Sequence, residues 1–335
     1  MSQIPPFPYK KEFISAEELY NNAVNLDLVD VTILDSHPFW IAVPGRYDFF
    51  LLPDGSKKKL ALVVKETAYE KVNKLVDYFS EEQRMLACRK EDVSPFDFYT
   101  QNFDQIQRKA AEIAKQNPSF PFRHALREAV YALTNECTTF KISVSKAIYQ
   151  LFKSKIVLDC SSGWGDRGIG AAAAGVQVYH GVDPNSSLRK SYDEILNFIR
   201  TSPSTPPSVH TDQYAITTED FLKVELVKNS YDLIFSSPPF FDYEIYSADT
   251  KQSITGRNTV DAWLQGFFFP YLKKAWEALV VGGHLVLYIS DTKTSRYTEK
   301  MYGFITNELK GQYLGILSMS DELLRKGYPI WVWKK

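Results

Sequence analysis

The stretch "KIVLDCSSGWGDRGIGAAAAGVQVYHGVDPN", residues 155–185, decides the fold class. It begins as an apolar strand that ends at Asp159, turns at Gly163 and Gly165, and enters a helix rich in small residues. A second apolar strand then ends at Asp183. Strand, glycine turn, helix and strand in this order are typical of a βαβ unit, in which a right-handed crossover joins two parallel strands.

The same alternation continues to the C-terminus and predicts an α/β fold. Helices are expected at residues 143–152, 166–175 and 186–200, and strands at residues 155–161, 176–184, 231–237, 283–290, 313–320 and 328–335. Such a pattern predicts a doubly wound, mostly parallel sheet with helices on both faces. The short link between the last two strands predicts a terminal β-hairpin. This layout resembles the Rossmann-like fold of class I methyltransferases, and we expect a catalytic domain over residues 136–335.

Residues 1–135 are expected to form an N-terminal α+β region that recognises substrate or binds a partner. β-rich patterns occur at residues 29–35, 39–52 and 60–66, and helical periodicity follows at residues 68–79 and 122–134.

The composition is that of an ordinary globular protein, with 44% hydrophobic and 24% charged residues. No apolar run reaches the roughly 18 residues needed to cross a membrane, and no signal peptide is recognised. The three cysteines show no paired spacing, so neither a disulfide framework nor a metal site is expected and a reducing cytoplasm is the predicted location. A net charge of −1 gives no global attraction for nucleic acid, which leaves that role to local patches.

The glycine turn predicts a bound cofactor. Glycines let a ligand approach the backbone, and the helix N-terminus offers free N–H groups, so the turn suits the carboxylate of an amino-acid-like cofactor. Asp183 is placed to accept hydrogen bonds from ribose hydroxyls. Gly168 completes a Gly-x-Gly-x-x-Gly spacing, but Asp166 would repel a pyrophosphate and suits a cofactor amine. The turn alone leaves a dinucleotide, S-adenosylmethionine and a simple tight turn open.

A second stretch, "YDLIFSSPPFFDYEIYS" at residues 231–247, suggests the chemistry. Two consecutive prolines cannot donate ladder hydrogen bonds, so the strand must end beside Ser237. Ligands of doubly wound sheets bind at the carboxyl ends of such strands. The alternative is an ordinary strand terminator with Phe240 in the core.

Ser237, Pro238, Pro239 and Phe240 resemble the Asp/Asn/Ser-Pro-Pro-Tyr/Phe/Trp signature of S-adenosylmethionine-dependent amino-methyltransferases that act on nucleic-acid bases. The resemblance implies that the Ser237 side chain and the Pro238 carbonyl accept hydrogen bonds from an exocyclic NH2. The ring of Phe240 would stack on an extruded base. Two acceptors localise the amine lone pair toward the methyl group, so positioning and electrostatics supply most of the rate.

The resemblance also implies S-adenosylmethionine as cofactor and a set of residues that bind it. These are Phe140, Asp159, Ser161, Gly163, Trp164, Gly165, Asp183, Asp220 and Phe221, with Ser161 at a place often held by glycine. Asp220 and Phe221 would bind and sandwich the adenine, and Trp164 either packs under the turn or lines the pocket. The sequence around these motifs, from Phe140 to the loop after Phe240, is also similar to that of predicted methyltransferases of phages and large DNA viruses.

Substrate contacts are expected from the loop after the motif. Candidates are Asp242, Glu244, Tyr246, Lys251 and Arg257; the alternative is a solvated loop. The target is adenine-N6 or cytosine-N4, with DNA favoured over RNA and with the base flipped or already single-stranded. The oligomeric state is not predicted.

Two rivals stay open. A protein glutamine methyltransferase holds a side-chain amide at a similar Asn-Pro-Pro-Tyr loop, although Ser237 replaces that asparagine. A catalytically inactive methyltransferase fold would instead serve as a binding subunit, and it would not be expected to bind S-adenosylmethionine.

Overall fold

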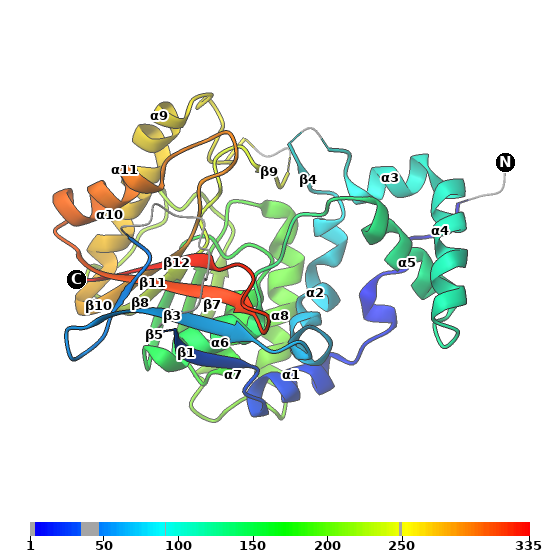
Figure 1. Ribbon diagram of the computed structural model, residues 1–335, viewed down its shortest axis with the longest axis horizontal. Helices are drawn as coiled ribbons and strands as arrows, with labels where there is room; N and C mark the ends of the chain where they lie inside the picture. Colours follow the sequence, from blue (N-terminus) through cyan, green and yellow to red (C-terminus); the bar gives the residue numbers. More distant parts are fainter. Residues whose placement is uncertain (1–3, 35–46, 91, 248–249) are drawn as a thin grey trace.

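The computed structural model describes residues 4–34, 47–90, 92–247 and 250–335 (Figure 1). A ten-stranded sheet forms its centre, in the order β1-β3-β2-β11-β12-β10-β8-β5-β6-β7. The strands of this sheet are β1 (Val29–Leu34), β2 (Phe50–Leu51), β3 (Lys57–Val64), β5 (Ile156–Asp159), β6 (Val178–Val182), β7 (Tyr214–Thr217), β8 (Tyr231–Ser236), β10 (Leu279–Tyr288), β11 (Gln312–Asp321) and β12 (Tyr328–Lys334). A separate two-stranded sheet joins β4 (Cys88–Arg89) to β9 (Glu244–Ile245).

Helices surround the central sheet. The α-helices are α1 (Ala16–Asn25), α2 (Leu75–Arg84), α3 (Pro95–Gln101), α4 (Phe103–Gln116), α5 (Phe122–Leu133), α6 (Ile142–Leu151), α7 (Asp166–Ala173), α8 (Arg189–Thr201), α9 (Val260–Trp263), α10 (Phe269–Ala278) and α11 (Thr298–Gly303). Short 3₁₀-helices are η1 (Lys10–Glu12), η4 (Ser186–Leu188) and η5 (Thr211–Gln213). Short π-helices are η3 (Tyr69–Asn73), η6 (Leu264–Phe268) and η7 (Phe304–Glu308).

The strand order confirms the predicted doubly wound sheet. Strands β7, β6, β5, β8 and β10 are parallel neighbours, and the chain reverses its direction of winding between β5 and β8. Strand β12 is antiparallel to both β10 and β11, which confirms the terminal β-hairpin. The point between β5 and β8 is therefore a topological switch point, where such sheets bind their ligands.

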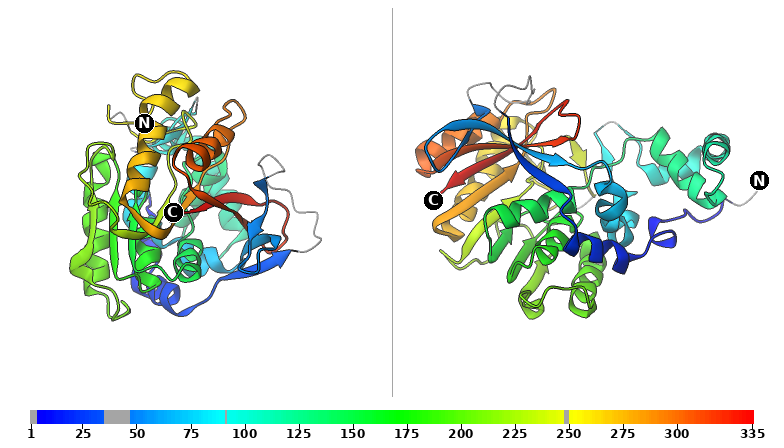
Figure 2. Two further views of the ribbon diagram at one scale, coloured as in Figure 1. Left: turned by 90° about the vertical axis from the view of Figure 1, so that its left-hand side faces the viewer. Right: turned by 60° about the horizontal axis from the view of Figure 1, so that its bottom comes forward.

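Alternating apolar residues bury both faces of the sheet, as expected for strands covered by helices on each side. Leu233 and Phe235 of β8 pack with buried residues of α1, α2, α6, α7 and α8. Ile234, between them, faces the other way and packs with buried residues of α9, α10 and α11. Figure 2 shows helices on either face of the sheet. The sheet therefore holds two separate apolar cores, one on each face.

The N-terminal strands extend this same sheet. Strand β3 runs parallel to β11, with Leu60 opposite Leu317 and Val64 opposite Asp321, and β1 pairs antiparallel with β3. Leu62 and Val64 share the core beneath β11. The boundary near residue 135 stays a prediction, and residues 39–46 of the expected β-rich segment lie outside the described residues.

A third apolar cluster holds α3, α4 and α5 together beyond the end of the sheet (Figure 1). It includes Tyr99, Ile106, Leu126 and Val130, and Phe7 packs on it from the N-terminal segment. Among the described residues, no helix has both the length and the apolar character needed to span a bilayer.

Candidate active site

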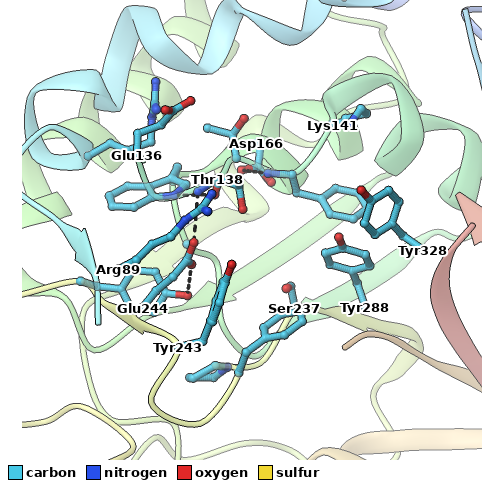
Figure 3. A pocket seen from close by; sticks show the side chains of 18 of the residues that line it. Arg89, Glu136, Thr138, Lys141, Asp166, Ser237, Tyr243, Glu244, Tyr288 and Tyr328 are labelled. Carbon is cyan, nitrogen blue, oxygen red and sulfur yellow. Dashed lines mark hydrogen bonds between the residues drawn. The ribbon is translucent and has the colours of Figure 1, made fainter. Parts of the chain in front are cut away.

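A cavity of about 1380 Å³ opens at the carboxyl ends of the central strands. Gly163 follows β5, Asp183 follows β6, Ser237 follows β8 and Ser290 follows β10, and all four line it. Helices α2 and α5 supply another wall, and Glu136, Thr138 and Lys141 also line the cavity (Figure 3). The glycine turn and the diproline corner therefore share one cleft.

The glycine turn has a backbone that other residues adopt only with strain. Gly163 has a φ of +56° and Gly165 a φ of +92°, both in the left-handed region. A Cβ on Gly165 would lie 2.5 Å from Cδ1 of Ile195. The Gly163 N–H donates to Oδ2 of Asp183 at 2.8 Å, and the Tyr192 hydroxyl donates to the Gly163 carbonyl. The turn is therefore held from both sides.

Substituting Gly165 by alanine is expected to lower the free energy of unfolding by about 2–4 kcal/mol. The left-handed backbone costs about 1–2 kcal/mol, and because fully buried Ile195 has little room to move its Cδ1 aside, overpacking adds a cost of similar size. Gly282→Ala is the matched control, because Gly282 has a φ of +84° and open space around its Cβ position. Urea unfolding measures both; equal losses would show that the contact with Ile195 carries no cost.

Asp159 lies beneath the cleft rather than in it. Its fully buried carboxylate accepts from Arg167 Nε at 2.8 Å, from the Tyr179 hydroxyl at 2.9 Å and from Ser236 Oγ at 2.9 Å. Arg167 also donates to the Ser161 carbonyl. The structure thus does not bring Asp159 to the cleft as a direct cofactor ligand; Asp159 instead fixes the ends of β5 and β8 and the start of α7.

Two buried carboxylates do face the cleft. Asp166 Oδ2 accepts from the Phe140 N–H at 3.2 Å, whereas Oδ1 has no hydrogen-bond partner and lies 3.5 Å from Arg167 Nη1. Burial raises the pKa of Asp166 to about 6, against the opposing charge of Arg167. Burial also raises the pKa of Asp183 to about 6, and the N–H groups of Asn185 and Gly163 oppose this rise.

An unpaired donor accompanies these carboxylates. The Nδ2 atom of Asn185 is buried without a hydrogen-bond partner among the described residues, and Asn185 lines the cleft. Unsatisfied buried polar atoms are uncommon and call for a ligand or a solvent molecule. Asp166 Oδ1 and Asn185 Nδ2 therefore give this side of the cleft an acceptor and a donor that make no hydrogen bond to the described residues.

Other predicted cofactor residues divide into two groups. Phe140, Ser161 and Trp164 line the cleft; Trp164 is 4% exposed and its Nε1 donates to the Thr138 carbonyl at 3.1 Å. The Trp164 ring is therefore part of the pocket wall.

Asp220 and Phe221 do not line the cleft. Phe221 is buried against Tyr271, with ring centroids 4.9 Å apart, and Asp220 Oδ1 accepts from the Leu222 N–H at 3.0 Å. The structure does not bring these two side chains to the position that the resemblance implied for binding adenine.

The diproline corner presents its first and last residues to the cleft. Ser237, Pro239 and Phe240 line it, whereas Pro238 is buried behind them. Figure 3 shows the Ser237 hydroxyl directed into the open space. Phe241 follows with a φ of +54°, which is unusual for a bulky residue and marks stored backbone strain.

The loop after the corner reaches back to the segment before the glycine turn. Glu244 Oε1 accepts from the Thr138 N–H at 3.3 Å, and Oε2 accepts from the Tyr246 hydroxyl at 2.7 Å. Burial raises the pKa of Glu244. Thr138 thus bonds the glycine turn through Trp164 and the substrate loop through Glu244.

Of the five candidate substrate contacts, Glu244 and Tyr246 line the cleft and the other three do not. Asp242 pairs with Lys90, and Lys251 lies 3.4 Å from Glu219.

The remaining candidate, Arg257, donates to the carbonyls of Ser253 and Thr255 at 3.1 and 3.3 Å. Among the described residues, no group of three or more His, Cys, Asp or Glu side chains is arranged to hold a metal ion.

Sequence reasoning missed the wall made by α2 and α5. Arg127 donates to Glu81 at 2.7 Å and to Asp77 at 3.1 Å, Arg84 donates to Asp77, and the Tyr131 hydroxyl donates to Glu81 at 2.7 Å. Four of these residues line the cleft; Glu81 does not. A signal existed, because the charges at positions 77, 81 and 84 fall on one helix face, where they face a matching set on α5.

Comparison with known proteins gives distant likenesses in structure. No family model matches the sequence, and no curated protein matches it. A tRNA (m1A58) methyltransferase from Aquifex aeolicus is similar with a TM-score of 0.37 and 13% identity, over 59% of this chain and 71% of that one.

Two further solved structures are similar to the same degree. A methyltransferase from Geobacter sulfurreducens has a TM-score of 0.37 and 10% identity, over 74% of this chain and 98% of that one. A SAM-dependent O-methyltransferase from Thermotoga maritima has a TM-score of 0.37 and 13% identity, over 62% of this chain and 70% of that one. At these scores the likenesses do not identify the function, which must be argued from the site.

Proposed function

We propose that the protein is an S-adenosylmethionine-dependent methyltransferase that methylates the exocyclic amine of a nucleic-acid base. DNA is the favoured polymer, and the target is adenine-N6 or cytosine-N4. One observation carries this proposal: the glycine turn at Gly163 and the diproline corner at Ser237 open into one cleft. That juxtaposition is what a transfer between a cofactor at the first and an amine at the second requires.

The residues on the glycine side fit S-adenosylmethionine. Asp166 Oδ1 makes an ion pair with Arg167 but accepts no hydrogen bond, which suits it to the cofactor ammonium group, and Asn185 Nδ2 is a donor without a hydrogen-bond partner among the described residues. Each Asp183 oxygen accepts one backbone N–H and keeps a lone pair for a ribose hydroxyl. When bound, the cofactor supplies an electrophilic methyl group on a sulfonium.

The diproline corner would hold the acceptor amine. Ser237 Oγ accepts one of its hydrogens, and the resemblance assigns the other to the carbonyl of Pro238, whose ring does not line the cleft. Two acceptors direct the nitrogen lone pair away from the ring, and Phe240 stacks on the base. Glu244 lines the same cleft and its raised pKa suits it to orient the base or accept the released proton. Asp242 is engaged by Lys90 away from the cleft, so this role falls to Glu244.

The test is incubation with labelled S-adenosylmethionine and DNA, RNA or protein, followed by mass spectrometry of the nucleosides and amino acids. Methylated adenine-N6 or cytosine-N4 supports the proposal, and Ser237→Ala is expected to lower turnover while calorimetry shows unchanged cofactor binding. Label on glutamine would establish the protein-methyltransferase rival. No cofactor binding at all would establish the inactive binding subunit.

Cofactor affinity is expected to fall as the pH drops below about 6. Asp166 is ionised above its pKa of about 6 and attracts the ammonium group; protonation removes that attraction. We expect affinity to fall by about tenfold per pH unit below this pKa, measured by calorimetry from pH 5 to pH 8. Asp166→Asn should bind weakly at pH 8 and show a flatter profile. An identical profile in the variant would remove Asp166 from the cofactor site.

A further inference from the structure

We propose that the cleft binds an unpaired DNA strand, and that nucleotides flanking the target base stack on tyrosines on either side of Ser237. This inference rests on the proposed methyltransferase function and specifies its substrate as single-stranded rather than duplex.

Aromatic rings stand on both sides of the diproline corner. Figure 3 shows the ring of Tyr243 on one side of Ser237 and the rings of Tyr288 and Tyr328 on the other, and all of them line the cleft. Tyr243 and Tyr328 are 43% and 42% exposed, although large aromatic side chains are usually buried. Their exposure at a cleft is typical of platforms on which bases stack.

The tyrosine rings beside Ser237 pack against other aromatic rings or lie close to basic side chains. Tyr288 packs edge-on against Phe140 and Phe240, with ring centroids 5.1 and 5.9 Å away, which fixes its orientation. Arg89 Cζ lies 5.7 Å from the Tyr243 ring and Lys326 Nζ lies 4.9 Å from the Tyr328 ring. Each cation lies over one face of its ring, so a nucleotide would stack on the opposite face with a positive charge close by.

The charge of the cleft argues against a duplex. Nine basic and nine acidic side chains line it among the described residues, so the lining has no net formal charge. Duplex binding depends on many phosphate contacts, whereas single-strand binding combines a few of them with base stacking. A duplex would also have to release the target base from its stack, which an unpaired strand avoids. A neutral, tyrosine-lined cleft therefore suits a single strand.

The experiment compares one oligonucleotide, single-stranded or annealed to its complement, as substrate of the full chain. We expect kcat/KM to be at least about tenfold higher for the single strand. Tyr243→Ala and Tyr328→Ala should each lower kcat/KM for it by about 5- to 100-fold, the range for loss of one stacked base. The affinity for S-adenosylmethionine should not change, and Tyr243→Phe and Tyr328→Phe should keep the activity.

Phe122→Ala is the matched control, since Phe122 is 48% exposed and does not line the cleft; it should keep the parental rate. Few phosphate contacts also predict a shallow salt dependence, with a log–log slope of about −1 to −2. Equal methylation of the duplex, a much steeper slope, or tyrosine variants at the parental rate would overturn the inference. Cofactor binding without methylation of any nucleic acid would instead overturn the proposed function.

Discussion

Phe240→Ala is expected to lower kcat/KM by at least about 100-fold. The Phe240 ring lines the cleft beside Ser237, and its removal takes away the stack that holds the base against the amine acceptors. One stacked base is worth about 1–3 kcal/mol, and a small misplacement of the reacting atoms costs about a further 10²-fold. Steady-state kinetics with a methylated oligonucleotide as product gives the measurement.

Two variants make this result specific to stacking. Phe240→Tyr keeps an aromatic ring in contact with Tyr288 and should retain most of the activity. Ser237→Ala removes one acceptor but keeps the stack, so its loss should be smaller than that of Phe240→Ala. Both alanine variants should bind S-adenosylmethionine as the parent does. Parental turnover in both would show that the diproline corner is not the acceptor site.

Arg127→Met is expected to lower the free energy of unfolding by about 3–5 kcal/mol. Arg127 is 2% exposed and pairs with Glu81 and Asp77, so its removal takes the Arg127 charge away from buried Glu81 and leaves Asp77 with Arg84. The network also joins α5 to α2 and forms a wall of the cleft. Denaturant unfolding followed by circular dichroism measures the loss.

The same helix offers a control at its surface. Arg123 pairs with Glu12 at 2.9 Å, and the two side chains are 46% and 36% exposed. Arg123→Met should therefore lower the free energy of unfolding by no more than about 1 kcal/mol. A loss of similar size in both variants would mean that the burial of Arg127 adds nothing to the strength of its pairs.

The local sequence pattern predicted the strands that are marked by a long apolar run, and it missed a short strand that has no such run. β5, α7 and β6 follow from an apolar run, a glycine turn and a small-residue helix. β7 was not predicted because "YAIT" is only four residues long and lies among polar neighbours. The joining of β3 to β11 was not predicted either, because a pairing of residue 60 with residue 317 leaves no periodicity in the sequence.

The candidate site was likewise predicted only in part from the sequence. Spacing predicted that Gly163, Asp183 and Ser237 would meet, since carboxyl ends of parallel strands share one edge of the sheet. Spacing alone did not distinguish the cleft-facing Asp166 from Asp159, which lies one layer deeper with Arg167. Such depth depends on which side chains pack around each carboxylate, and that is a property of the tertiary structure.

The position of β12 has a consequence for biosynthesis. This strand is the last of the ten to leave the ribosome, yet it lies between β10 and β11 near the middle of the sheet. Until residues 328–334 emerge, β10 and β11 both carry unpaired edges, and no strand pairing joins β11 and the N-terminal strands to the parallel half. Exposed edges invite pairing with other chains. A nascent chain stalled before Tyr328 is therefore expected to aggregate or to occupy chaperones.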